Sequence, residues 1–210
     1  MTTLFDIHTH HTEFSHKAII SVTPTEFTPL HNKYYSIGIH PWNQITNDEY
    51  IFDLLQQYIQ HPQVVALGET GIDRLRGENI EKQIERLDKQ IAISEKYKKP
   101  LILHVVRGID IILAMHKKHK PQQPWIIHGF RGNKSTARQL LDKGINISFN
   151  INLDVESVLA TPLEKLWIES DENTTDITET YKKIAYIKNI SIKELTNSIM
   201  QRAEKLFFQP

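Results

Sequence analysis

The sequence of 210 residues contains no cysteine, and its formal net charge is zero, with 25 Lys and Arg against 25 Asp and Glu. The absence of cysteine excludes disulfide bonds and thiolate ligands, so any metal ion must be held by imidazole and carboxylate groups. Such a set suits zinc, manganese or iron, with magnesium as a further option. The zero net charge argues against a broad electrostatic grip on duplex DNA, which needs many phosphate contacts.

The chain also lacks a Pro-, Gly- or Ser-rich linker, an internal repeat and a run of about 18 apolar residues. A chain of this length can bury one core, and we predict a single domain over residues 1–210. The first apolar strand begins too early to leave room for a signal peptide. We therefore expect a cytoplasmic protein with no membrane partner and no obligate protein partner.

Two histidines near the start of the chain are the most informative feature. A short apolar run from Leu4 ends in His8-Thr9-His10. Alternate side chains of a strand point to the same face, so His8 and His10 face the same way. Neutral imidazole is a common metal ligand. Taken alone, the pair also fits an incidental or structural role.

The same pattern, an apolar run that ends in a residue able to bind metal, recurs along the chain. The runs 34–39, 64–68, 100–103, 125–127 and 166–170 end at His40, Glu69, His104, His128 and Asp171. Helical segments are predicted between several of these runs, over 79–97, 109–116 and 136–143, with two more helices between 181 and 208. Alternating strands and helices favour βαβ units and a parallel sheet or barrel, in which catalytic groups lie at the carboxyl ends of the strands.

Six side chains of the ligand type are thus expected at one rim: His8, His10, Glu69, His104, His128 and Asp171. Each residue alone could be a buried histidine or a helix cap, but six in register are enough to hold two metal ions.

At this point the chain resembles the TatD-type metal-dependent hydrolases of the amidohydrolase-like barrel superfamily. The matching stretches are Asp6-Ile7-His8-Thr9-His10, Gly38-Ile39-His40-Pro41, Gly68-Glu69-Thr70-Gly71-Ile72-Asp73, Pro100-Leu101-Ile102-Leu103-His104, His128-Gly129-Phe130-Arg131-Gly132 and Glu169-Ser170-Asp171. The resemblance implies an α/β fold, a TIM-like (β/α) barrel, with the six residues above as metal ligands. It also implies metal-dependent phosphoester hydrolysis, and members of the family are commonly assigned as deoxyribonucleases.

The chain departs from the family pattern in three places. The stretch from His10 to Gly38 is short, and residues 18–22 read as a strand without its helix, so we expect the barrel to be shortened or distorted near strands 1 and 2. Arg107 stands one residue later than the family's arginine after His104, and Arg131 replaces a serine. The proline that usually follows Asp171 is absent.

We therefore expect a phosphodiesterase or deoxyribonuclease that acts on DNA ends or small nucleic-acid phosphoesters through a metal-activated water. One or two divalent ions, zinc, manganese or magnesium, would be bound. Glu69 would bridge them, with His8, His10 and Asp171 on one ion and His104 and His128 on the other. Asp171 would also accept the proton of the attacking water, which makes Asp171 and Glu69 the catalytic residues. His40, Arg107 and Arg131 would orient the phosphate.

Two further readings stay open. The same ligands could serve a barrel metallohydrolase that cleaves an amide, a lactone or a small phosphomonoester, or a non-catalytic metal-binding protein.

The basic residues expected to follow strands are few, namely Lys17, Arg74, Arg76, Arg107, Arg131 and Lys134. Trp42 either stacks on a nucleobase or anchors its loop by packing.

Overall fold

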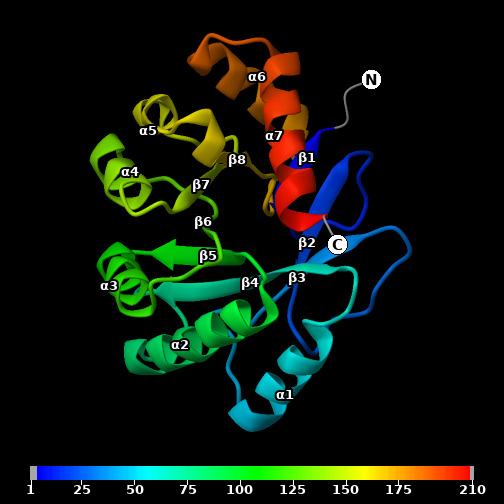
Figure 1. The fold of residues 1–210 in the computed structure, drawn as a ribbon, viewed down its shortest axis with the longest axis vertical. Coiled ribbons are helices and arrows are strands. Elements are labelled where there is room, and N and C mark those ends of the chain that lie inside the picture. The colour runs from blue at the N-terminus through cyan, green and yellow to red at the C-terminus, as the bar shows by residue number, and fades with distance from the viewer. Residues whose placement is uncertain (1–3, 209–210) are drawn as a thin grey trace. The chain divides into compact units, whose positions relative to one another are not determined.

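The computed structural model describes residues 4–208, and in this range the strands follow one another in one hydrogen-bonded sheet in chain order (Figure 1). The strands are β1 (Phe5–Thr9), β2 (Lys17–Val22), β3 (Tyr34–Ile37), β4 (Val64–Asp73), β5 (Leu101–Val106), β6 (Trp125–Ile127), β7 (Asn146–Phe149) and β8 (Leu166–Ile168). The helices are α1 (Asp48–Tyr58), α2 (Ile80–Tyr97), α3 (Ile109–His119), α4 (Lys134–Leu141), α5 (Val155–Ala160), α6 (Ile177–Lys188) and α7 (Ile192–Phe207), with a 3₁₀ turn, η1 (Leu163–Lys165). The arrangement confirms the predicted TIM-like (β/α) barrel.

The chain divides into two compact units. The first unit holds residues 4–20 and 127–208, and the second unit holds residues 21–126. The single domain over residues 1–210 stays a prediction. None of the helices within residues 4–208 has the length and apolar character required to cross a bilayer.

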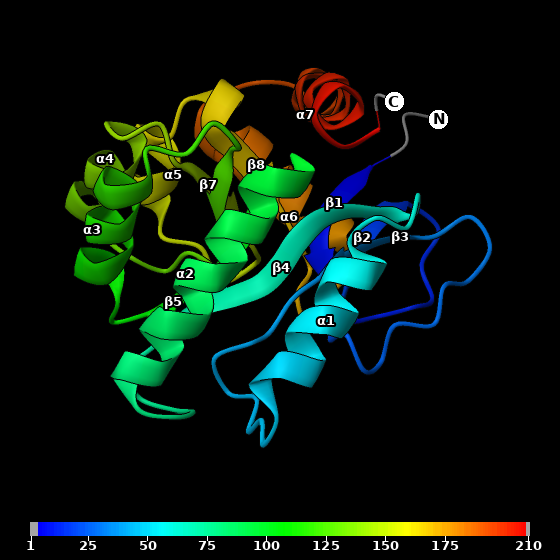
Figure 2. The ribbon, with the colours of Figure 1, turned by 60° about the horizontal axis from the view of Figure 1, so that its bottom comes forward.

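In the second unit β3, β4 and β5 pair in parallel, with Ile37 opposite Leu67 and Leu67 opposite Leu101. Helix α2 lies along β4, as Figure 2 shows, and buries Leu87 and Ile91. Helix α1 begins at the side chain of Asn47, which accepts a hydrogen bond from Tyr50 N–H.

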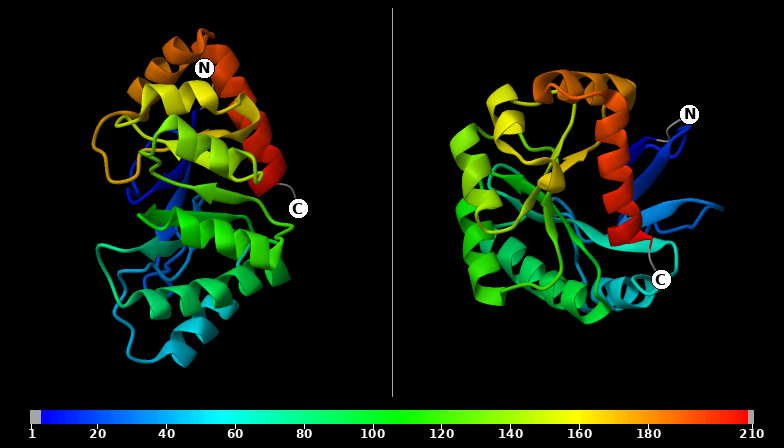
Figure 3. Two further views of the ribbon diagram at one scale, coloured as in Figure 1. Left: turned by 90° about the vertical axis from the view of Figure 1, so that its left-hand side faces the viewer. Right: turned by 45° about the horizontal axis from the view of Figure 1, so that its top comes forward.

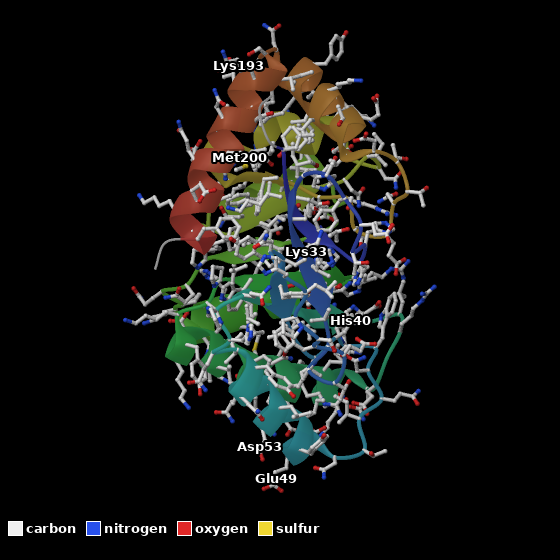
Figure 4. All side chains as sticks on the ribbon, turned by 90° about the vertical axis from the view of Figure 1, so that its right-hand side faces the viewer. Lys33, His40, Glu49, Asp53, Lys193 and Met200 are labelled. Carbon is white, nitrogen blue, oxygen red and sulfur yellow. The ribbon has the colours of Figure 1, made fainter. Side chains whose placement is uncertain are left out.

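Helix α1 is amphipathic, which explains how it packs although it was not among the predicted helices. Its buried side chains are Ile51, Phe52 and Leu55, spaced for one helical face. Glu49 and Asp53, labelled in Figure 4, lie on the opposite, exposed side of α1. Helix α5 and strand β7 were also not predicted, because each is too short to show a clear period.

Strand β4 corrects one boundary of the predicted strands. The apolar run was expected to end at Gly68, but the strand continues to Asp73, so Glu69 lies inside it. Gly71 makes this extension possible, since its φ is +146° and a Cβ atom at that position would lie 2.0 Å from the carbonyl oxygen of His104. The close approach of the two backbones brings the second half of β4 beside His104 of β5.

In the first unit β7 pairs in parallel with β8, and Thr9 of β1 forms a β-bridge with Asp171 just beyond β8. Helices α6 and α7 pack together and α7 contacts β1; the right-hand view of Figure 3 shows the red helix α7 beside the blue first strand. Strand β1 is buried along its whole length, and Phe5 makes ring contacts with Trp167 and Phe207. Strand β1 is thereby packed against β8 and the last turn of α7.

The expected shortening near strands 1 and 2 is confirmed, because no helix lies between β1 and β2 or between β2 and β3 within the described residues. Lys17 is the first residue of β2, not a residue that follows a strand, which corrects its predicted place. Its ammonium group pairs with Glu204 of α7 at 2.8 Å and lies 3.4 Å from the ring centroid of Phe208. Lys17 therefore ties β2 to the C-terminal helix.

Tyr181 of α6 supplies a test of how β1 is held. Its hydroxyl donates to the Phe5 carbonyl oxygen at 2.7 Å and accepts from Phe5 N–H at 3.2 Å, with the side chain fully buried. We expect Tyr181→Phe to lower the free energy of unfolding by about 2 kcal/mol, because two buried backbone groups lose their partner. Denaturant unfolding measures this change. Tyr186→Phe on the same helix, at a side chain 88% exposed, is the control and should leave stability unchanged; equal midpoints for both variants would contradict the role of Tyr181.

Candidate metal-binding site

Four of the predicted ligands lie together in the first unit. His8 Nε2 is 3.7 Å and His10 Nε2 is 3.8 Å from Asp171 Oδ1, and the rings of His8 and His128 are 4.1 Å apart. Donor atoms of His8, His128 and Asp171 all lie within 4.8 Å of one another. Ligands that are each about 2.1 Å from a common ion lie about 3–4 Å apart, so these side chains have the spacing of a shared metal site.

The backbone fixes Asp171 beside the two histidines of β1. Asp171 N–H donates to the His8 carbonyl oxygen at 3.0 Å, and His10 N–H donates to the Asp171 carbonyl oxygen at 3.2 Å. Asp171 has a φ of +57°, a left-handed conformation that Asp tolerates better than most residues. Pairing with β1 thus holds an unusual turn, and the turn sets the direction of the carboxylate.

Two fully buried carboxylates, Asp6 and Glu169, surround this cluster. Asp6 accepts from Ser170 Oγ at 2.6 Å and lies 3.4 Å from His16 Nε2. Glu169 Oε1 is 3.5 Å from His128 Nδ1. Burial raises the pKa of Glu169, but the nearby His128 and His8 lower it by more, so the pKa lies below its usual value. Buried carboxylates need positive charge close by, and a divalent ion on the neighbouring imidazoles would supply it.

The second unit contains another cluster of donors, formed by Glu69, His104 and His40. His104 Nδ1 is 2.9 Å and His40 Nε2 is 3.1 Å from Glu69 Oε1. Glu69 is 6% exposed, so its carboxylate is screened little by water. Donor atoms of the three residues lie within 4.8 Å of one another, so Glu69 and His104 have the spacing of a second metal-binding group, with His40 beside them.

The tautomer of His40 follows from its other contact. The backbone N–H of Trp42 donates to His40 Nδ1 at 3.1 Å, so Nδ1 acts as an acceptor. In the neutral ring the proton must then be on Nε2, which donates to Glu69. His40 is labelled in Figure 4, in the segment that follows β3. Its geometry is that of an N–H donor beside the cluster, and its contact to a phosphate stays a prediction.

Asp73, the last residue of β4, is the part of this site that sequence reasoning missed. Its Oδ2 atom accepts from Trp42 Nε1 at 2.7 Å and lies 3.3 Å from His104 Nε2, and its Oδ1 atom accepts from Leu75 N–H at 2.7 Å and from Arg76 N–H at 3.1 Å. Burial raises the pKa of Asp73, but these hydrogen bonds outweigh it, so the pKa lies below its usual value. Asp73 could have been found from the sequence as the last residue of the matching stretch Gly68-Glu69-Thr70-Gly71-Ile72-Asp73.

Asp73 also orients His104. With Nε2 directed to the Asp73 carboxylate, Nδ1 faces Glu69 and the side of the ring on which an ion would sit. A carboxylate that accepts from the second nitrogen of a ligating imidazole fixes its tautomer and raises its basicity. Glu169 Oε1 lies beside the Nδ1 atom of His128 at the longer distance of 3.5 Å, within the range of an ion pair.

The predicted substrate-binding arginines, Arg107 and Arg131, are both exposed. Within the described residues the Arg131 side chain makes no hydrogen bond or ion pair. Arg74, in contrast, forms a two-pronged pair with Asp110 at 2.7 and 2.8 Å. Lys134 pairs with Glu156 at 3.0 Å.

Comparison with known proteins places the chain in a family. The sequence profile described as "TatD related DNase" matches residues 7–208. The chain belongs to this TatD family. The resemblance and the expected class, a metal-dependent hydrolase, are thereby confirmed.

Bacterial relatives of similar sequence support membership of this family. The chain is 29% identical to the metal-dependent hydrolase YcfH of Escherichia coli K12, over 84% of this chain and 74% of that protein. It is 30% identical to YjjV of the same organism, over 76% and 64% of the two chains. It is 28% identical to the 3'-5' ssDNA/RNA exonuclease TatD of Klebsiella pneumoniae, over 64% of this chain and 55% of that one.

Solved structures support the fold. The crystal structure of YjjV matches with a TM-score of 0.81 at 21% identity and covers 99% of this chain and 98% of its own. A TatD family hydrolase from Entamoeba histolytica matches with a TM-score of 0.80 at 18% identity, over 99% of both chains.

The contact between Asp73 and His104 can be tested through metal affinity. Asp73→Asn keeps the size of the side chain but removes one acceptor oxygen, and we expect the affinity for divalent metal to fall about 10- to 100-fold. Competition against a chelator, with circular dichroism to verify folding, measures the change. Asp53→Asn on the exposed face of α1 is the matched control. If both variants bind metal as tightly as wild type, Asp73 does not position a ligand.

Proposed function

We propose that this protein is a metal-dependent phosphodiesterase that hydrolyses the ends of nucleic-acid strands or small nucleic-acid phosphoesters. The observation that carries the proposal is the pair of donor clusters, His8, His128 and Asp171 in the first unit and His40, Glu69 and His104 in the second. Each cluster has a buried carboxylate behind one imidazole, as metal ligands commonly have. The TatD relative named as a 3'-5' ssDNA/RNA exonuclease supports a nucleic-acid substrate.

The donor set also supports the choice of metal. Imidazole nitrogens and carboxylate oxygens suit zinc and manganese, and magnesium where several waters stay bound. When bound, a divalent ion supplies a water of lowered pKa and a positive charge for the phosphoryl oxygens. His8, His10, Glu69, His104, His128 and Asp171 are proposed as the residues that hold one or two such ions.

The remaining roles belong to side chains of this chain. Asp171, whose side chain is 23% exposed, is accessible enough to accept a proton from the attacking water. His40 Nε2–H is directed toward the cluster and can donate to a phosphate oxygen. The exposed Arg131 and Arg107 can supply paired N–H groups to a phosphate.

Metal analysis followed by a substrate panel tests the function. We expect the purified protein to contain, or to take up on titration with zinc, manganese or magnesium, one or two divalent ions. The panel contains single-stranded DNA with free ends, dinucleotides, phosphomonoesters, lactones and amides. Hydrolysis of the phosphodiesters in preference to the others supports the proposal. Binding of none of the three metals, or turnover confined to lactones or amides, overturns it. Glu69→Ala should reduce the bound metal, and Glu49→Ala on α1 should not.

Loss of the proposed base gives a sharper test. Asp171→Asn retains the size of the side chain but cannot accept the proton, so we expect kcat to fall by a factor on the order of 10² or more. Steady-state kinetics on the best substrate of the panel provide the measurement. Glu172→Gln, at the exposed neighbouring carboxylate, is the control. Turnover near the wild-type value in Asp171→Asn would show that another group accepts the proton.

Arg131 is a test of substrate contact. We expect Arg131→Ala to raise KM without a change in metal content. The slope of log KM against the logarithm of the salt concentration should fall by about 1, the value for one lost phosphate contact. Arg138→Ala, an exposed arginine of the following helix α4, is the control. An unchanged KM and salt slope in Arg131→Ala would assign this residue to the solvated surface.

A further inference from the structure

One aromatic side chain of the second unit is exposed directly beside the donor cluster. Trp42 is 41% exposed, whereas the other two tryptophans of the chain, Trp125 and Trp167, are 1% and 2% exposed. The Trp42 ring centroid lies 4.7 Å from that of His40 and 5.3 Å from that of His104. An indole in this place does not serve mainly to fill the core, because much of its surface stays in contact with water.

The indole is also held in a fixed orientation. Its Nε1–H donates to Asp73 Oδ2 at 2.7 Å, and Asp73 is only 2% exposed. The same carboxylate lies 3.3 Å from His104 Nε2. A buried charge that binds both the indole and the imidazole keeps the plane of Trp42 in a constant relation to the donor cluster.

A cation lies against the same ring. The guanidinium carbon of Arg76 is 5.0 Å from the Trp42 ring centroid, within the range of a cation–π contact. Asp73 Oδ1 accepts hydrogen bonds from the backbone N–H groups of Leu75 and Arg76, so the segment that carries Arg76 is ordered by the carboxylate that orders Trp42. The side chain of Arg76 is exposed and can turn toward a bound ligand.

We propose that Trp42 and Arg76 form a platform for the nucleotide adjoining the phosphate that is cleaved, with the nucleobase stacked on the indole and the guanidinium on the next phosphate. This inference rests on the proposed function and names the part of the substrate that the enzyme recognises. An aromatic plane stacks on any base, and a planar guanidinium pairs with phosphate, so the platform selects single-stranded nucleic acid without a strict sequence preference.

The geometry fits a nucleotide better than a small ester. The platform lies next to His40 and His104, so a base on the indole places its own phosphate near the donor cluster. Inside a duplex both faces of each base are already stacked, so along a strand the bases are free to lie on the ring only where the strand is single. A lactone or an aliphatic amide has neither an aromatic face for Trp42 nor a second anionic group for Arg76.

Binding in the presence of a chelator isolates the platform from metal and turnover. The probes are a short single-stranded DNA and the same strand with an abasic site at its 3' end. Since Trp42 is the exposed tryptophan of the three, we expect its fluorescence to be quenched as the DNA binds. Stacking is worth about 1–3 kcal/mol per base, so the abasic strand should bind roughly 10-fold more weakly.

Variants assign the effect to the two side chains. Trp42→Ala should weaken binding about 10-fold and bind both strands alike, and Trp42→Phe should retain part of the preference for the strand with its base. Arg76→Ala should reduce the slope of the logarithm of the binding constant against the logarithm of the salt concentration by about 1, because one phosphate contact is lost. Tyr50→Ala, at an exposed aromatic side chain of α1 that is 57% exposed, is the control. Circular dichroism verifies that each variant folds.

The outcomes separate this inference from the proposed function. If wild type hydrolyses single-stranded DNA but Trp42→Ala binds and cleaves it with an unchanged KM, the platform is wrong and the function stands. If wild type loaded with metal hydrolyses no phosphodiester, the function fails. The platform is then overturned as well if Trp42→Ala and wild type bind the two strands equally, and it is supported as a binding site if they differ.

Discussion

The site in the second unit depends on one buried carboxylate. Asp73 binds the indole of Trp42, contacts the imidazole of His104 and holds the backbone of the segment after β4, while it is itself only 2% exposed. A carboxylate in such a place is stabilised by hydrogen bonds to its charged form, and each donor is in turn fixed by the strength of a charge-assisted bond. The orientation of His104, a proposed metal ligand, and of Trp42, a proposed substrate contact, is therefore set by one residue that has neither of these two roles itself.

In the first unit, too, buried carboxylates lie beside the proposed metal ligands, but they belong to other residues. Its carboxylate, Glu169, is fully buried beside His128, and Asp6 holds Ser170 and the start of the turn that carries Asp171. The β-bridge between Thr9 and Asp171 then aligns the turn with the two histidines of β1. In both units a strand places an imidazole and a buried carboxylate lies against it, an arrangement typical of a preorganised site.

The spacing of apolar residues, and the ligand-type residues that follow the apolar runs, predicted much of the fold and of the two donor clusters from the sequence. The apolar runs located β1, β3, β4, β5, β6 and β8, and the ligand-type residues that follow these runs in the sequence include the members of both donor clusters. The length of β4 could not be predicted, because its second half depends on Gly71 allowing the backbone to approach β5. The roles of Asp73 and Glu169 were also out of reach, since a carboxylate inside a motif gives no sign of which imidazole it will meet. Lys17 was misplaced for the related reason that the boundary of β2 carries no local signal.

The donor set alone does not determine which bond is cleaved. Imidazole and carboxylate ligands activate water for phosphoesters, amides and lactones alike, because the chemistry of the bound ion is common to all of them. Discrimination must come from groups that touch the rest of the substrate, where a contact missing from one substrate separates it from another. In this chain the groups proposed for that contact lie in the loops after the strands: Trp42 and Arg76 beside the second cluster and Arg131 after His128. Arg131 replaces a residue that is usually serine in the family, so the ligands can stay constant while the loops change the substrate. A buried carboxylate that fixes both ligand and loop, as Asp73 does, limits how far such change can go without loss of the metal site.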